Sequence, residues 1–145
     1  MTATREQVMT ALLAKLGAAY AFGVVGRRLR DPNNIAVTSQ PALFLLKHSE
    51  HYAARGPNMP SVRTLHLLAA VYISVGQDEA AIPDAVLNPI QDAIDAALAA
   101  DDPTRNFCTL GGLVQSVKIV GEVTCAPGDI TGRGLAMIPI DVIIP

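Results

Sequence analysis

The sequence contains no tryptophan, and aromatic residues make up only 4% of its 145 positions. Its core must therefore be built from alanine, valine, leucine and isoleucine. Charged residues are also scarce, at 17%, against roughly 25% in a typical soluble domain. A domain with so little charge often covers part of its surface with partners, because large exposed apolar patches mark interaction sites. An alanine-rich composition without such a patch is the alternative, and composition alone leaves both open.

An excess of positive charge is missing as well. The formal net charge is -2 and the pI is about 5.8, whereas proteins that bind nucleic acid through counterion release need a basic face. The first residues, MTATREQ, lack the basic-then-apolar layout of a secretory signal. The apolar run TLHLLAAVYISVGQ is shorter than the ~20 residues that span a bilayer. We therefore expect neither specific nucleic-acid binding nor a membrane.

Catalytic and metal-binding motifs are also missing. Cys108 and Cys125 lack CxxC spacing, which favours two small buried thiols kept reduced. His48 and His51 lie three positions apart, so their side chains would diverge on a strand, and no third ligand follows at a suitable spacing. The two glycines after Thr109 lead into a predicted strand and lack the pattern of a phosphate-binding loop. We expect no catalytic residues, no cofactor and no metal.

Amphipathic patterns alternate with apolar runs along the chain. The stretch TREQ, residues 4–7, is a capping box that predicts the start of a helix extending to about Phe22. A second helix is predicted from an N-cap at Asn88, with Pro89 in its first turn, up to Pro103. Strands are predicted at about 41–47, 62–76, 114–124 and 132–145. This order predicts one α+β domain spanning 1–145, with a mainly antiparallel sheet of about four strands and two main helices packed on one face.

The stretch HSEHYAARGPNMPS, residues 48–61, is predicted to form a long loop between two apolar strands. Loops of this length inside compact domains are usually functional or disordered. We expect this one to be mobile in the free monomer and ordered against a neighbouring protein. Its candidate contact residues are His51, Tyr52, Arg55 and Asn58.

Arg27, Arg28 and Arg30 form the one concentrated basic patch of the sequence. The patch follows the first predicted helix and precedes a turn-forming DPNN stretch. Two interpretations remain open: a solvated loop, or a contact with an acidic partner surface or with DNA that passes nearby.

The last run, GRGLAMIPIDVIIP, is almost wholly apolar. On a strand, Ala136, Ile138, Ile140 and Val142 would share a uniformly apolar face, which we expect to lie under the helices. Asp141 falls on the opposite face and should meet solvent or a partner, because a buried unpaired carboxylate is costly. We predict an edge or near-edge strand that completes the domain's own sheet and places an apolar rim close to an interface. The candidate interface residues here are Asp141, Val142, Ile143 and Ile144.

Three stretches together carry a family resemblance: QPALFLL, the LNPIQDAIDAAL helix followed by TLGGLV, and the IPIDVIIP ending. In their order and spacing the chain resembles the tail terminator, or tail completion, proteins of long-tailed bacteriophages over nearly its whole length. The resemblance implies a non-enzymatic virion protein, present in the host cytoplasm during assembly. It would form a homohexameric ring on the head-proximal end of the tail tube and stop tube polymerisation. It would also dock the head-completion, or neck (stopper), protein, while DNA passes through the lumen without specific binding.

Two other functions fit the same sequence. A head-tail connector, or tail-to-head joining protein, would share most of these features and differ in the neighbours it touches. A small-ligand-binding or enzymatic α+β domain belongs to a different class, and ligands would raise its melting temperature.

Because the histidines and cysteines lack a convergent arrangement, we predict that the triple variant His48→Ala, His51→Ala and Cys108→Ser has the same background metal content as the wild type. Elemental analysis of both purified proteins measures this. A stoichiometric metal in the wild type that the triple variant loses would contradict the prediction.

Overall fold

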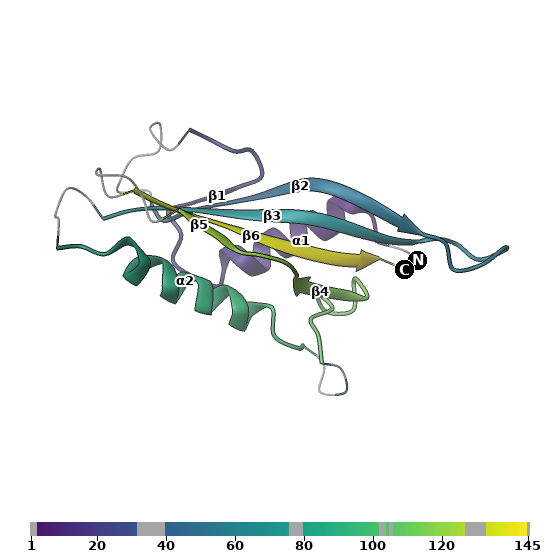
Figure 1. Cartoon of the computed structure of the whole chain (residues 1–145). Coiled ribbons are helices and arrows are strands. Elements are labelled where there is room, and N and C mark those ends of the chain that lie inside the picture. Colours follow the sequence, from purple (N-terminus) through teal and green to yellow (C-terminus); the bar gives the residue numbers. More distant parts are fainter. Residues whose placement is uncertain are drawn as a thin grey trace.

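The computed structural model describes residues 3–31, 40–75, 80–101, 104, 106–126 and 133–144. Within these residues it contains two helices and six strands (Figure 1). In chain order they are α1 (Arg5–Gly17), β1 (Val24–Gly26), β2 (Ala42–Ala53), β3 (Val62–Ser74), α2 (Pro83–Ala97), β4 (Ser116–Ile119), β5 (Thr124–Ala126) and β6 (Arg133–Ile144). The α+β class is therefore confirmed, although the sheet has more strands than the four expected.

The strands form one sheet in the order β1-β2-β3-β6-β4, with β5 also paired to β6. β1 runs parallel to β2 and every other pairing is antiparallel, so the sheet is mixed. β3 pairs with β6 from Arg63 opposite Ile144 to Ser74 opposite Arg133. Because β4 and β5 occupy its other side, β6 is an interior strand. The expectation of an edge strand was wrong, and the expectation that the last residues complete the domain's own sheet is confirmed.

Pro139 lies within this interior strand, where a residue without an N–H usually breaks a ladder. Its carbonyl accepts a hydrogen bond from the Val120 N–H at 3.2 Å. In an antiparallel pair the N–H and C=O of one residue point to the same side. The missing donor therefore faces residues 120–123, between β4 and β5. The single strand expected over 114–124 divides there, at Gly121 with its φ of 107°.

α1 begins as the sequence predicts. The Gln7 N–H donates to Thr4 Oγ1 at 3.2 Å, and the Thr4 N–H donates to Gln7 Oε1 at 2.9 Å. The helix ends at Gly17 and not near Phe22. A Cβ at position 17 would lie 3.2 Å from Val25 Cγ1, so β1 passes close to the last turn of α1. β1, which the sequence analysis did not predict, thus adds a parallel strand at the edge of the sheet.

α2 begins at Pro83, five residues before the predicted N-cap at Asn88. Pro83 takes the first position, where a missing N–H costs nothing, while Ile82 caps the helix without a side-chain hydrogen bond. Pro89 lies inside the helix, where it removes one backbone hydrogen bond. The helix continues past it because Leu87 and Ile90 are buried on either side and pack against the sheet.

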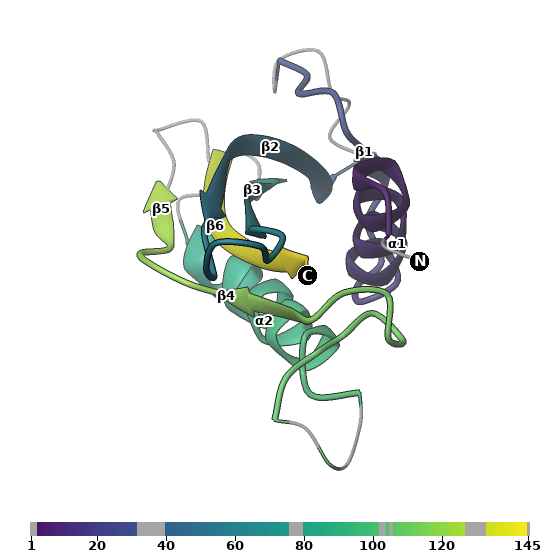
Figure 2. The ribbon, with the colours of Figure 1, turned by 90° about the vertical axis from the view of Figure 1, so that its right-hand side faces the viewer.

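Both helices cover the same face of the sheet, as predicted (Figure 2). Leu12 and Leu16 of α1 and Ile94 of α2 belong to one core cluster with the inward side chains of β2, β3 and β6. The four β6 residues expected to lie under the helices, Ala136, Ile138, Ile140 and Val142, are all buried in this cluster. Neither helix has the length and apolar composition needed to cross a bilayer, within the described parts of the chain.

β2 is longer than predicted and reaches Ala53. Residues 48–53, expected to belong to a loop, continue the ladder with β3 after a bulge between Lys47 and Ser49. The connection to β3 is therefore short, and the β2–β3 hairpin extends to one end of the molecule (Figure 1). We call residues 48–62, from the bulge to the start of β3, the hairpin arm.

We predict that deleting residues 142–145 abolishes folding, because Val142 and Ile144 are fully buried and also hold the end of β3. Burying a side chain of this kind contributes about 1.5–3 kcal/mol, against a total stability of ~5–15 kcal/mol. Circular dichroism with thermal melting measures the loss. The matched control is Ile143→Ala, on the half-buried face, which should keep a cooperative transition. A truncated protein that melts like the wild type would contradict the interior position of β6.

Candidate interaction surface

The four candidate contact residues of the hairpin arm are all exposed. Tyr52 is 54% exposed and Met59, at the tip, is 57% exposed, which is unusual for side chains of this size and apolar character. The tip itself is a turn, in which the carbonyl of Gly56 accepts hydrogen bonds from the N–H groups of Asn58 and Met59 at 3.2 and 3.3 Å. The arm thus presents a defined apolar and basic surface to solvent.

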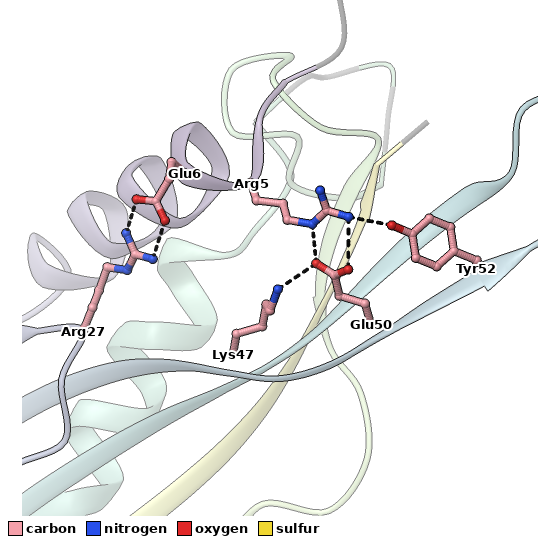
Figure 3. A network of polar contacts seen from close by, with 6 residues as sticks. All are labelled: Arg5, Glu6, Arg27, Lys47, Glu50 and Tyr52. Atoms are coloured by element: carbon pink, nitrogen blue, oxygen red, sulfur yellow. Dashed lines mark hydrogen bonds and ion pairs between the residues drawn. The ribbon is translucent and has the colours of Figure 1, made fainter.

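Arg5, at the start of α1, holds the base of this arm (Figure 3). Its guanidinium donates to both carboxylate oxygens of Glu50, with Nη2 3.1 Å from Oε2, and also to the hydroxyl of Tyr52. Lys47 Nζ lies 2.9 Å from Oε1 of the same carboxylate. These two cations, Arg5 first, lower the pKa of Glu50 from 4.5 to about 2. The paired charges fix β2 to α1 at the point where the arm leaves the body.

The next residue of α1, Glu6, binds Arg27 in the same way (Figure 3). Arg27 Nη1 and Nη2 lie 2.7 and 2.9 Å from the two oxygens of Glu6, and this hydrogen bonding lowers the pKa of Glu6. Arg27 is therefore committed to an internal ion pair. Arg28 and Arg30 are exposed and form no ion pair with the described part of the chain. The predicted basic patch is thus reduced to two free cations.

At the C-terminal end of β6 the candidate residues divide by face. Asp141 lies opposite to the helices and is half-buried, and its Oδ1 is 2.7 Å from Nδ1 of His66 on β3. Val142 and Ile144 belong to the core, and Ile143 is half-buried on the face of Asp141. The apolar rim expected here therefore consists of Ile143 alone, beside a carboxylate that already has a partner.

The fold brings the arm and the end of β6 together. Tyr52 pairs with Arg63, and Arg63 pairs with Ile144, so the three lie in one cross-strand row. The first turn of α1 adjoins both the arm, through Arg5, and Arg27, through Glu6. The sequence gives no signal for these ion pairs, because Arg5 and Glu50 lie 45 positions apart.

The TLGGLV stretch forms a turn around a carboxylate. Asp101 accepts hydrogen bonds from the N–H of Thr109 at 3.0 Å, from its hydroxyl at 2.9 Å and from the N–H of Gly111 at 2.9 Å. These donors, Gly111 first, lower the pKa of Asp101 to about 2. The backbone has positive φ at Leu110, Gly111 and Gly112. The N–H groups of Thr109 and Gly111 are used by the carboxylate of Asp101, and that of Gly112 is used by Thr109, which agrees with the expectation that this is no phosphate loop.

The two cysteines differ in environment. Cys108 is buried, as predicted, but Cys125 is exposed, 3.4 Å from the amide nitrogen of Gln91 on α2. The prediction was wrong for Cys125 because this residue lies on β5, a short strand at the edge of the sheet. In the described chain, no further strand pairs with the outer side of β5. Among the described residues, no group of three or more His, Cys, Asp or Glu side chains could hold a metal ion.

We predict that acid destabilises the protein as the pH falls from about 4.5 to about 2. Glu50 and Asp101 have folded-state pKa values near 2, below their ordinary values of 4.5 and 3.8, so the folded state binds fewer protons. Their contribution is complete above the ordinary values and is lost as the pH approaches 2. Glu50→Gln should be less stable at pH 7 and should show a flatter loss in this window, measured by urea unfolding. A Glu50→Gln profile parallel to that of the wild type would contradict this account.

No family model matches the chain, and no curated protein sequence matches it. Solved structures do match its fold. One chain of a structure described as "Virion of native gene transfer agent (GTA) particle" superposes with a TM-score of 0.56 at 9% sequence identity. The match covers 94% of this chain and 93% of that one. The fold described above is thus similar, over nearly all of both chains, to that of a protein in a gene transfer agent virion.

Proposed function

We propose that the protein is a structural virion component that caps the head-proximal end of a phage-type tail tube as a ring. In this role it stops polymerisation of the major tail tube protein and offers a docking surface to the head-completion protein. The observation that carries the proposal is the fold shared with a chain of a gene transfer agent virion. That likeness runs over nearly all of both chains, and therefore reflects the architecture of the chain and not a local motif.

The sequence resemblance to tail terminator proteins supports the finer assignment. It rests on stretches that the fold places at different points: QPALFLL leads into β2, LNPIQDAIDAAL lies in α2 and IPIDVIIP ends β6. The order of these stretches along the fold supports the terminator role. A connector position between tail and head fits the same likeness to a virion protein, and the experiment below separates the two roles.

The charged groups support a role without catalysis. The carboxylates with the most strongly lowered pKa values, Glu50 and Asp101, are used by an internal ion pair and by a turn. Groups with shifted pKa values gather at active sites, but ion pairs that only support the structure shift them too. The exposed apolar residues of the arm fit a contact surface better than a substrate pocket, because the arm protrudes from the body (Figure 1). DNA would pass through the lumen without specific binding, which agrees with a net charge of -2.

We predict that the purified protein stops the growth of tubes assembled from the major tail tube protein of the same genome. Tube lengths in electron micrographs should become shorter with added protein, and a ring of extra density should appear at one end of each tube. The control is the same protein unfolded by heat before it is added. Unchanged tube lengths with no density at either end would contradict capping. Binding to the head-completion protein without any effect on tubes would favour the connector role.

A further inference from the structure

The two ends of the molecule each expose a large apolar side chain. At one end the arm carries Tyr52 and Met59. At the other end Ile82, which precedes α2, is 62% exposed. Figure 1 shows the tip of the arm and the start of α2 at opposite ends of the long axis. Contiguous exposed apolar surface marks interaction sites, and complementary charges across an interface determine which surfaces pair.

The arm and α2 also differ in charge. Residues 51–74 run from the end of β2 through the tip to the end of β3. They contain Arg55 and Arg63 and no carboxylate. α2 contains no lysine or arginine, and its three carboxylates are exposed. Asp84 lies in the first turn, and Asp92 and Asp95 lie about two and three turns further along the helix. Neither Arg55 nor any of these three aspartates forms an ion pair within the described residues, so both sets of charge are available to a partner.

One chain cannot bring these two surfaces together. The arm is fixed to α1 by Arg5 at one end of the body, and α2 begins at the other end (Figure 1). The complementary charges therefore meet only between two molecules. A contact between two different patches of one chain is heterologous, and repetition of it closes a ring when the rotation allows.

We propose that the hairpin arm of one copy docks on the start of α2 of the next copy. Met59 packs against Ile82, and Arg55 faces Asp84 in the first turn of α2. The partner of the arm is a second copy of this chain, because every copy carries both the basic arm and the acidic start of α2. This contact rests on the proposed ring and gives it a direction, since every copy offers an arm on one side and α2 on the other.

Two variants that each destroy one surface test the contact. Met59→Asp removes the apolar side chain at the tip of the arm. Ile82→Asp puts a carboxylate at the start of α2, which is the surface that accepts the arm. Each alone should weaken self-association at least about 10-fold, because anchors of an interface carry most of its energy. Mixed in equal amounts, the variants should form a dimer and stop there, because only one arm and one acceptor surface stay intact in each pair. Native mass spectrometry counts the subunits, and Val120→Asp, a change to an exposed apolar residue away from both ends, is the matched control.

The outcomes separate the contact from the proposed function. Full-size rings from both variants, or a mixture that stays monomeric while the control assembles, would overturn the arm-to-α2 contact and leave a ring with another interface. A wild type that stays monomeric at all concentrations would overturn self-association itself, and the tube-growth measurement would then decide the proposed function separately. Circular dichroism of each variant must match the wild type, and Met59→Ser and Ile82→Ser replace any variant that fails to fold.

Discussion

The pairing of β3 with β6 is the constraint on which the rest of the structure depends. It extends over the whole length of β6, and it joins residues far apart in the sequence. Each strand then has a second neighbour, β2 on one side and β4 with β5 on the other. The inward residues of this central pair are the surface on which both helices rest. The apolar inward face of β6 is thereby part of the core.

The same pairing accounts for the arm. β6 ends with Ile144 opposite Arg63, and the ladder of β2 with β3 continues only one pair further, to Ala53 opposite Val62. The hairpin therefore leaves the sheet where its third strand stops. Residues 54–61 project beyond the sheet, and the ion pair between Arg5 and Glu50 ties the end of β2 to α1. A projecting element fixed at its base suits the contact surface proposed for it.

The sequence predicted the features that local chemistry decides. The capping box at Thr4 and the buried face of β6 follow from patterns over a few residues, and both appear as predicted. The polar stretch after Lys47 suggested a loop, but backbone pairing with β3 continues β2 through it. The start of α2 was missed because burial of Leu87 and Ile90 outweighs the stop signal of Pro89. Whether β6 lies at an edge, and which residues meet Arg5, depends on contacts between distant segments that one sequence does not reveal.

The central claim is that this chain forms a ring in the virion, at the junction of tail tube and head. A cryo-electron microscopy reconstruction of the neck of particles that contain the protein tests this most directly. The account predicts one closed ring of copies of this fold on the last layer of the tube, each with its hairpin arm on the neighbouring copy. A neck without this fold, or isolated copies bound elsewhere on the particle, would contradict it.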